Sequence, residues 1–415
     1  MSEVKEKALA AKAASSKLAT LTTDQKNRAL LRMADMLISE SGSIIEANAK
    51  DLERGREQGL SSALLDRLAL DEKRIRAMAE GLVQIAELPD PVGDVLEQFE
   101  RPNGLRIRKI RVPIGLIGII YEARPNVTVD AAGLCLKTGN AVLLRGGSSA
   151  LHSNIRIVEV LHQAMAGTDL PVEALQLVHS TDRSSVDEML KLNGILDVVI
   201  PRGGAALIQN VIQNATVPAI ETGAGICHTY IDAEADPQMA SDIAFNAKVQ
   251  RPSVCNAMET LLVHEQFASV HLPALAERLR SAGVELKGCD ASRRYVPWMA
   301  EAAESDWDTE YNDYILNVKV VAGLDEALEH IRKHGTMHSE CIVTNNQANA
   351  ERFLNEVDAA AVYHNASTRF TDGFEFGFGA EIGISTQKLH ARGPMGLPAL
   401  TSTKYQIYGS GQIRT

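Results

Sequence analysis

Apolar residues recur at helical spacing over the first part of the chain. In residues 29–37 they stand three and four positions apart, and Ala, Leu, Lys and Glu dominate residues 1–90. This spacing gathers apolar side chains on one face of an α-helix. We expect Thr23 and Asp24 to cap the start of that helix, because both side chains accept backbone N–H bonds. Residues 88–93, with two prolines and a glycine, are expected to end the helical region.

A period of two replaces the helical period after this breaker. Residues 105–112 alternate apolar and mostly basic side chains, and the Asn103-Gly104 pair before them favours a tight turn. We therefore predict a β-hairpin over residues 94–112. The tail, residues 401–413, has the residue types of an extended segment and is expected to pair with the second arm of the hairpin.

From Pro113 onward, short β-rich runs alternate with helix-like stretches. Strands separated by helices indicate parallel, doubly wound sheets, and the two series of runs indicate two α/β domains joined near residues 221–231. The runs are 114–121, 141–144, 175–178, 197–200 and 229–231, followed by 259–263, 318–321, 341–343 and 360–363.

Length, charge and cysteine content narrow the class of protein. The 415 residues exceed what one compact core usually holds, and the net charge of −11 disfavours nucleic-acid and anionic-membrane partners. The longest apolar run, 112–121, is far shorter than the roughly 20 residues that cross a membrane, and the N-terminus lacks the apolar core of a signal peptide. Five scattered cysteines argue against a disulfide framework. We expect a cytoplasmic enzyme.

One cysteine stands where a nucleophile could lie. Cys255 is in the segment Gln-Arg-Pro-Ser-Val-Cys-Asn, where Pro252 breaks any helix and a β-rich run follows. A cysteine on such a turn can be partly exposed and close to free backbone N–H groups, which favours a thiolate. The alternative is a buried, inert cysteine. Core packing or an incidental surface position is expected for the other four: Cys135, Cys227, Cys289 and Cys341.

Two Arg-Gly-Gly turns are candidates for anion binding. Neither GxGxxG nor GxxxxGK[ST] is present, but Arg145-Gly-Gly and Arg202-Gly-Gly each follow a predicted strand. Free N–H groups at a helix start, together with an arginine, can hold a phosphate. Ordinary βα turns that use glycine for its backbone freedom are the alternative.

Two later segments carry weaker signals. Residues 365–396 are rich in glycine and hydroxyl groups beside arginines, which suits either an anion site or a solvated loop. His330, His334 and His338 are four positions apart. Because no cysteine or carboxylate completes a ligand set and Gly335 is expected to end the helix, we predict no metal site.

Five segments together resemble the aldehyde dehydrogenase superfamily, and within it the acyl-phosphate reductases that act on L-glutamyl 5-phosphate. They are residues 112–130, 137–147, 250–256, 365–373 and 385–396, and the resemblance covers essentially the whole chain. It implies an aldehyde-dehydrogenase-like α/β fold, with two doubly wound parallel-sheet domains and a small β oligomerisation arm. The expected domains are residues 1–222, with the N-terminal helices, the NADPH site and the arm 94–112, then the catalytic residues 223–389, then a C-terminal return and oligomerisation strand, 390–415.

The resemblance also assigns roles to single residues. It implies Cys255 as nucleophile and Asn126 as the side-chain half of the oxyanion hole. The residues implied for NADPH are Arg145 at its 2′-phosphate with the adjacent Gly146, Gly203 and Gly204 at its pyrophosphate, and Glu310 at its nicotinamide ribose. Those nominated for the charged substrate are Arg251 and Arg369, with Lys388 and Arg392 as further candidates. Glu221 falls near the general base of hydrolytic relatives, which a reductase does not need, and it is left out of the catalytic set.

The implied activity is the reduction of L-glutamyl 5-phosphate in the second step of L-proline biosynthesis. The implied assembly is a homodimer or homotetramer, with glutamate 5-kinase as a candidate partner. Two alternatives remain open at this point. One is a hydrolytic aldehyde dehydrogenase, which would turn over without phosphate, and the other is a non-catalytic relative, which would lack a reactive thiol.

Overall fold

The computed structural model describes residues 1–414, except for the side chains of Ala63 and Ala205. Unit 1 holds Met1–Thr222, Gly377–Gly383 and the chain from Met395 onward, and unit 2 holds Gly223–Phe376 and Ile384–Pro394. The expected domain boundaries put residues 377–383 with the catalytic domain and 390–394 with the C-terminal return. The structure instead places 377–383 in unit 1. It keeps 390–394 in unit 2, where β14 (Ile384–Ser385) pairs with β15 (Gly393–Pro394).

The helical start of unit 1 matches the apolar spacing of its sequence. Its helices are α1 (Glu3–Leu18), α2 (Thr23–Ser39), α3 (Ser41–Glu57), α4 (Ser62–Leu68) and α5 (Glu72–Glu87). In α2 the spaced apolar residues, among them Leu30, Met33 and Leu37, are buried. The expected caps Thr23 and Asp24 are wrong, because the cap is the preceding residue, Thr22. The Thr22 hydroxyl accepts the Gln25 N–H, and the Gln25 side chain accepts the Thr22 N–H, a reciprocal pair that starts the helix at Thr23.

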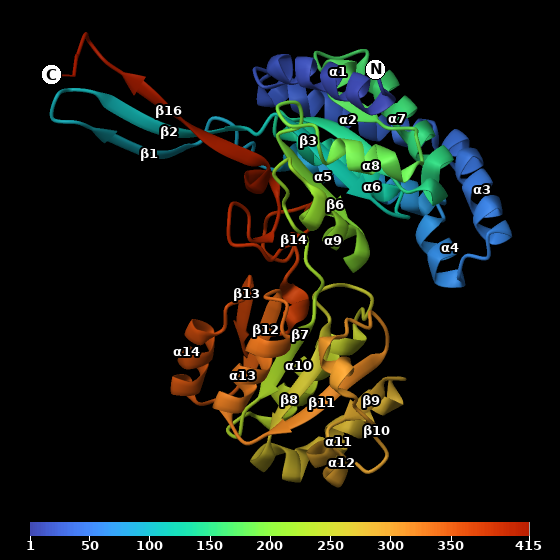
Figure 1. Ribbon diagram of the computed structural model, residues 1–415, viewed down its shortest axis with the longest axis vertical. Coiled ribbons are helices and arrows are strands. Elements are labelled where there is room, and N and C mark those ends of the chain that lie inside the picture. Colours follow the sequence, from blue (N-terminus) through green and yellow to red (C-terminus); the bar gives the residue numbers. More distant parts are fainter. Residues whose placement is uncertain (415) are drawn as a thin grey trace. The chain divides into compact units, whose positions relative to one another are not determined.

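A four-stranded parallel sheet in the order β5-β4-β3-β6 forms the centre of unit 1 (Figure 1). Helices α2, α3 and α5 pack on α6 and α7 as an outer layer. Strands β3 and β4 are buried along their whole length, as expected for central parallel strands. The strands are β3 (Leu116–Tyr121), β4 (Ala141–Gly146), β5 (Leu175–Leu177) and β6 (Val198–Arg202), and the remaining helices are α6 (Asn126–Lys137), α7 (Leu151–Met165), α8 (Arg183–Met189) and α9 (Ala205–Asn214).

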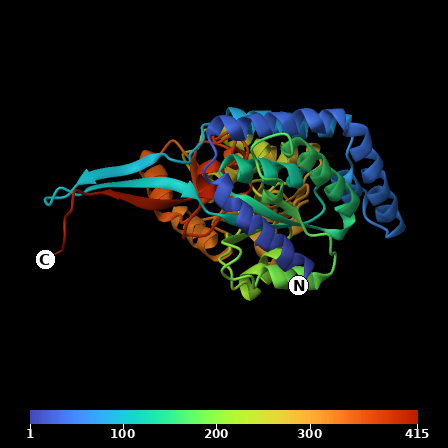
Figure 2. The same cartoon turned by 90° about the horizontal axis from the view of Figure 1, so that it is seen from above.

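A three-stranded antiparallel ribbon extends from the body of unit 1 in both views (Figures 1 and 2). The predicted hairpin forms β1 (Val95–Glu100) and β2 (Arg106–Pro113), and the tail forms β16 (Thr401–Tyr408), which pairs with β2. The expected pairing of the tail with the second hairpin arm is confirmed. Every residue of β1 is exposed, so the ribbon has almost no core of its own.

Unit 2 is a seven-stranded parallel sheet in the order β10-β9-β11-β8-β7-β12-β13. Its strands are β7 (Cys227–Ile231), β8 (Met258–His264), β9 (Glu285–Gly288), β10 (Ala300–Glu301), β11 (Ile315–Val321), β12 (Ser339–Val343) and β13 (Ala361–His364). Its helices are α10 (Pro237–Val249), α11 (Glu265–Ser281), α12 (Asp290–Tyr295), α13 (Leu324–His334) and α14 (Gln347–Glu356).

Alternate residues of the unit 2 strands belong to two separate cores. Ile231 and Leu261 pack with residues of α10 and α11, whereas their neighbours Tyr230 and Leu262 pack with residues of α13 and α14. Because successive side chains of a strand point to opposite faces, the two helix pairs cover opposite faces of the sheet. The doubly wound α/β architecture expected from the sequence is confirmed. Within residues 1–414 no helix is long and apolar enough to cross a membrane.

Candidate active site

Cys255 lies on a turn between α10 and β8, at the amino edge of the unit 2 sheet. Residues 250–257 leave α10 at Gln250 and enter β8 at Met258 without regular structure, and the Cys255 side chain is half-buried. Pro252 explains why the helix does not continue, because proline has no N–H to donate within a helix. The turn predicted from the sequence is therefore present, and it leaves the thiol partly accessible.

The other cysteines have different surroundings. Cys135, Cys227 and Cys341 are fully buried, and burial raises the pKa of all three thiols, to about 12 for Cys341. Such thiols stay protonated at neutral pH and are poor nucleophiles. Cys289 is half-buried but caps the start of α12, where its sulfur accepts the Ser292 N–H. Packing, not chemistry, accounts for the positions of these four.

Gly225 allows the chain before β7 to pass directly against the turn of Cys255. A Cβ atom at this position would overlap the Cys255 carbonyl oxygen and lie 2.5 Å from its carbonyl carbon. The Gly225 N–H donates to Glu310 Oε1 at 2.8 Å, which holds the glycine in place. In unit 2, Glu310 thus orders the backbone that faces Cys255, while its expected contact with a nicotinamide ribose stays a prediction.

Asn256 joins the same turn to the segment after β13. Its Nδ2 donates to the carbonyl oxygen of Thr371 at 2.8 Å, and its own carbonyl oxygen accepts the Thr368 hydroxyl at 2.7 Å. Its side-chain oxygen also accepts from the Arg369 guanidinium. Residues 367–371 and the turn of Cys255 are therefore one hydrogen-bonded assembly.

Two arginines create a local excess of positive charge at this assembly. Arg369 donates only to neutral partners, the Asn256 and Gln250 side chains, and Arg251 is exposed. Neither forms an ion pair within residues 1–414. Burial and the neighbouring Arg251 charge lower the pKa of Arg369, whereas Asp372 and Cys255 oppose this shift. An anion bound here would relieve the repulsion between the two guanidinium groups.

The further candidates Lys388 and Arg392 are less suited to bind an anion. Both form ion pairs with Asp358, Arg392 at 2.7 Å. The two cations hold the pKa of the Asp358 carboxyl below its usual range. Their charge is thus already balanced within unit 2.

In unit 1 the two Arg-Gly-Gly turns lie on either side of the end of β3. The sheet register sets Tyr121 opposite Gly146 on one neighbouring strand and opposite Arg202 on the other. This is the carboxyl edge of a parallel sheet, where ligands of α/β proteins usually bind. The structure therefore brings together the two turns that the sequence could only name separately.

A carboxylate occupies the second of these turns. Glu122 Oε2 accepts the Gly204 N–H at 2.9 Å, at the start of α9, and a Cβ atom on Gly203 would lie 2.6 Å from the same oxygen. The start of a helix carries a partial positive charge and free N–H groups, which favour anions. Glu122 thus acts as a built-in anion in the cradle where the pyrophosphate of a dinucleotide is expected.

Arg145 and Gly146 have local roles in this structure. The Arg145 guanidinium donates to the carbonyl oxygens of Thr181 and Asp182 at 2.9 and 3.1 Å, which orders the loop before α8. Burial lowers its pKa. A Cβ atom on Gly146 would overlap the Asn154 side chain, so close packing requires glycine. Their contacts with NADPH stay predictions.

Asn126, the candidate for the oxyanion hole, is the first residue of α6. Its side chain is exposed, and Nδ2 donates to Asp130 Oδ2 at 3.0 Å. Burial raises the pKa of Asp130 to about 6, and the bonds from Asn126 and the charge of Arg202 oppose this shift. Asn126 belongs to unit 1 and Cys255 to unit 2, and the oxyanion role stays a prediction.

His330 and His334 belong to an aromatic cluster of unit 2, and all three spaced histidines are buried. The ring centroid of His330 lies 5.3 Å from that of Trp307 and 4.5 Å from that of His334. Burial lowers the pKa of His330 to about 2 and that of His338 to about 4, so both rings are neutral near pH 7. Gly335 ends α13 as expected. Among residues 1–414, no three His, Cys, Asp or Glu side chains are grouped to hold a metal ion.

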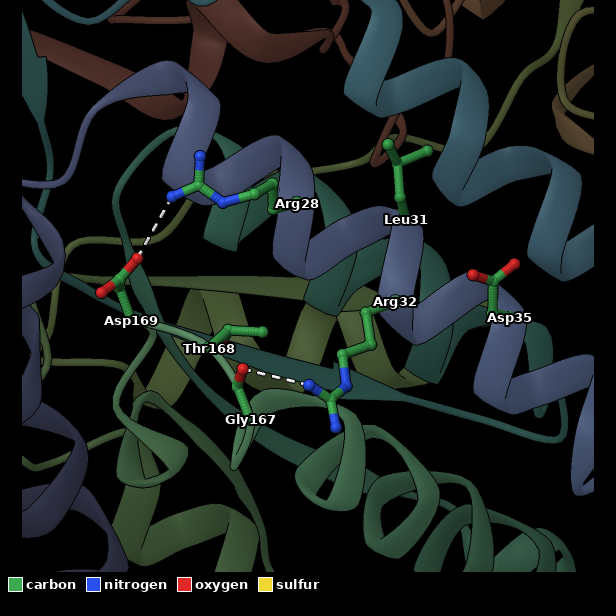
Figure 3. A pocket seen from close by; sticks show the side chains of 7 residues that line it. All are labelled: Arg28, Leu31, Arg32, Asp35, Gly167, Thr168 and Asp169. Carbon is green, nitrogen blue, oxygen red and sulfur yellow. Dashed lines mark hydrogen bonds and ion pairs between the residues drawn. The ribbon is translucent and has the colours of Figure 1, made fainter.

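A surface depression between α2 and the segment after α7 has none of the candidate residues in its lining (Figure 3). Its two arginines already have partners, since Arg28 pairs with Asp169 and Arg32 donates to the Gly167 carbonyl at 3.0 Å. Both guanidinium groups are therefore already hydrogen-bonded within the protein.

The sequence did not single out several residues that shape the two regions: Glu122, Gly225, Asn256, Lys248 and Glu259. Glu122 and Asn256 stand within segments 112–130 and 250–256, which carry the family resemblance. Lys248 and Glu259 could have been identified by another pattern, a charged residue inside a run of buried positions. Glu259 in β8 is an example.

Comparisons with known proteins show which family this chain resembles. A model of the aldehyde dehydrogenase family matches residues 1–306. A γ-glutamyl phosphate reductase of Caldanaerobacter subterraneus subsp. tengcongensis is 60% identical over 412 residues, covering 99% of this chain and 100% of that protein. The crystal structure of γ-glutamyl phosphate reductase from Thermotoga maritima is 51% identical, with a TM-score of 0.98 over 100% of both chains. An engineered glycolyl-CoA reductase with bound NADP⁺ has a TM-score of 0.68 at 15% identity, over 98% of this chain and 96% of that chain.

Proposed function

We propose that this chain, which belongs to the aldehyde dehydrogenase family and within it to the γ-glutamyl phosphate reductases, reduces L-glutamyl 5-phosphate with NADPH. The products are L-glutamate 5-semialdehyde and phosphate, in the second step of L-proline biosynthesis. The chain is an oxidoreductase of that family. The observation that carries the proposal is the half-buried cysteine Cys255 close to two arginines, neither of which forms an ion pair within residues 1–414.

Cys255 is the proposed nucleophile. Its thiolate attacks the γ-acyl carbon, the bond from that carbon to the phosphate oxygen breaks, and phosphate leaves with the electron pair. A thioester on Cys255 remains. Backbone N–H groups of the turn and the Asn126 amide are the proposed donors to the developing oxyanion. Hydride transfer to the thioester carbon and release of the thiolate then give the aldehyde.

Arg251 and Arg369 are the proposed partners of the anionic substrate. The acyl phosphate carries a phosphate and an α-carboxylate. Neither arginine forms an ion pair within residues 1–414, although the charge of Asp372 acts on Arg369. Guanidinium groups suit both anions, because they offer several donors in a planar fork. Positioning by these bonds would hold the acyl carbon within reach of the thiol.

The turns at the carboxyl edge of the unit 1 sheet are the proposed site for the phosphates of a dinucleotide. They offer the N–H groups at the start of α9, and the Glu122 carboxylate bound there supports the proposal that this site accepts an anion. Gly203 and Gly204 would hold the pyrophosphate, and Arg145 would approach the 2′-phosphate that distinguishes NADPH from NADH. When bound, NADPH supplies the hydride that reduces the acyl group.

Replacing Glu122 by glutamine is expected to tighten NADPH binding. The change removes a negative charge that competes with the pyrophosphate, while the amide oxygen can still accept the Gly204 N–H. A charge at a helix start contributes about 0.3–1 kcal/mol, so Kd should fall roughly two- to five-fold at low ionic strength. Fluorescence titration with NADPH measures the shift, and Glu329→Gln, an exposed position in unit 2, is the control. Weaker binding would mean that Glu122 contacts the cofactor favourably.

Replacing Arg251 by methionine is expected to lower kcat/KM for the acyl phosphate by about ten-fold or more. Loss of one charge-assisted bond to a bound anion costs roughly 1.5–3 kcal/mol. The exposed Arg251 side chain makes no ion pair within residues 1–414, so the turn should keep its shape. Steady-state kinetics measure the effect, and Arg332→Met, an exposed arginine on α13, is the control. Unchanged kcat/KM in both Arg251→Met and Arg369→Met would remove these residues from the substrate site.

The experiment that tests the proposed reaction supplies L-glutamyl 5-phosphate from a coupled kinase and follows NADPH oxidation and phosphate release together. We expect both products in equal amounts, because each turnover breaks one acyl-phosphate bond and consumes one hydride. NADPH oxidation without phosphate release would contradict the proposal.

The ribbon of β1, β2 and β16 supports a homo-oligomer. Phe99, Tyr405 and Ile407 are 42%, 57% and 61% exposed on it, and an isolated ribbon with so little core is marginal in water. Contact with a second copy would cover these side chains and the open strand edges. Sedimentation should give the mass of a dimer or tetramer at micromolar concentration, and a strictly monomeric profile would contradict this.

A further inference from the structure

A buried ion pair connects the two ends of the turn that carries Cys255. Lys248 Nζ lies 2.7 Å from Glu259 Oε2, and the two side chains are 0% and 1% exposed. Lys248 is in the last turn of α10, and Glu259 is the second residue of β8. The segment between them contains all of residues 250–257. The pair therefore fixes the separation of the two points at which the catalytic turn is attached.

The same carboxylate also holds the loop that supports Gly225. Glu259 Oε1 accepts the Asn312 N–H at 3.1 Å. Asn312 has a φ of 56°, in the left-handed region, and this conformation belongs to the short loop that also contains Glu310. Glu310 in turn accepts the Gly225 N–H, and Gly225 lies against the Cys255 carbonyl group. Glu259 is thus connected to Cys255 by two series of contacts, one along the turn itself and one through residues 310–312.

Stability alone is a weak explanation for this pair. Removing two charges from water costs free energy of folding. Well-packed apolar residues in the same place often stabilise a protein as much or more. Burial raises the pKa of Glu259 to about 7 and lowers that of Lys248, each shift opposed by the partner's charge. Glu310 and Tyr311 also interact electrostatically with Glu259, and Asp313 and Cys227 with Lys248. What such a pair provides is a fixed geometry, because each oxygen of the carboxylate has its own donor.

We infer that Lys248 and Glu259 are positioning residues of the catalytic turn: their ion pair holds Cys255 at the place and angle from which it attacks the acyl carbon. The inference rests on the proposed function, in which Cys255 is the nucleophile. It assigns neither residue a contact with substrate or cofactor.

The test uses a paired substitution, Lys248→Met with Glu259→Gln. It removes both charges together, so that neither remains buried alone, and it keeps an amide oxygen for the Asn312 N–H. The matched control is Lys26→Met with Asp90→Asn, which removes a buried ion pair of 2.5 Å in unit 1. The readouts are the thermal midpoint, the alkylation rate of Cys255 by iodoacetamide across pH, read by peptide mapping, and kcat and KM on the full-length protein.

We expect the Lys248/Glu259 variant to fold and to bind NADPH as the parent does. Its Cys255 alkylation rate and its kcat should both fall, on the order of 10–100-fold, because small displacements of a reacting group have effects of this size. The Lys26/Asp90 variant should keep both rates, whatever its thermal midpoint. If the Lys248/Glu259 variant does not fold, Glu259→Asp, which withdraws the carboxylate but keeps its charge, should show the same loss.

Parent-like alkylation and kcat in the Lys248/Glu259 variant would overturn the inference, as would an equal loss in the Lys26/Asp90 variant. Alkylation needs no substrate, so it separates this inference from the proposed function. If Cys255 of the parent is no more reactive than Cys289, the proposed function fails. If it is more reactive and stays so in the Lys248/Glu259 variant, only the positioning role fails.

Discussion

The Cys255→Ala variant is expected to lose turnover by at least about 10³-fold, while it folds and binds NADPH as the parent does. Removal of a nucleophile eliminates the covalent route and leaves only the weak contribution of binding and oxyanion donors. Alanine fits the turn, because it is smaller than cysteine and the Cys255 side chain is half-buried. Turnover is measured by kinetics with the acyl phosphate, folding by circular dichroism, and NADPH binding by a fluorescence titration.

Cys289→Ala is the matched control for this variant. Cys289 is the other half-buried cysteine and also belongs to unit 2, but its sulfur only caps α12. We expect it to keep parental kinetics. Full activity in Cys255→Ala would mean that the acyl group never passes through this thiol, and the covalent mechanism would have to be abandoned.

The second large effect is expected for Gly225→Ala. The added Cβ would lie 2.5 Å from the Cys255 carbonyl carbon and 2.9 Å from its Cα, so one of the two backbone segments must move. Overpacking of this kind typically costs about 1–3 kcal/mol of stability. The displaced turn should also lower kcat by about 10² or more, because Cys255 moves away from its attacking position.

Gly42→Ala is the control for the second variant. Nothing lies within 4 Å of a Cβ at Gly42, and the residue is within helix α3, so alanine should be neutral or slightly stabilising. Thermal unfolding and kcat are measured for both variants. A Gly225→Ala protein with parental stability and kcat would show that the close approach of the two segments is not required.

Local patterns predicted most of the fold. Every sequence run assigned as a strand contains or overlaps a strand of the structure, because buried parallel strands such as β3 and β4 are continuous apolar runs. Strands β14 and β15, of two residues each, were missed, and so were β9 and β10 of unit 2. Strand β9 has only four residues, with an exposed glutamate and a half-buried lysine among them, and β10 has two exposed residues. Strands this short carry too few apolar positions for a pattern to form.

The path of the chain between units could not be read from local patterns. Residues 377–383 join unit 1 and 384–394 join unit 2, although the whole segment is rich in glycine and polar residues. Where such a segment lies is decided by contacts made far away in the sequence, for example Ile382 with Met395 through a backbone bond of 3.0 Å. The spacing of residues along the sequence does not predict these contacts.

The candidate site was predicted only in part, because the groups that contact its turns also come from distant segments of the sequence. The turn at Cys255 was visible in Pro252 and the β-rich run after it, but its partners come from distant segments, since Asn256 bonds to Thr368 and Thr371. The Arg-Gly-Gly turns were visible, whereas the Glu122 carboxylate between them depends on the order β4-β3-β6. Arg145 was nominated for a phosphate, and only the structure shows its donors bound to the loop before α8.

The reverse reaction tests the central claim most directly. The purified protein is mixed with L-glutamate 5-semialdehyde and NADP⁺, and NADPH formation is followed by absorbance with and without inorganic phosphate. Because phosphate must attack the thioester on Cys255 to complete the reverse cycle, NADPH should accumulate through repeated turnovers only when phosphate is present. Equal, sustained accumulation without phosphate would contradict the account, since water would then resolve the thioester and the chain would be a hydrolytic dehydrogenase.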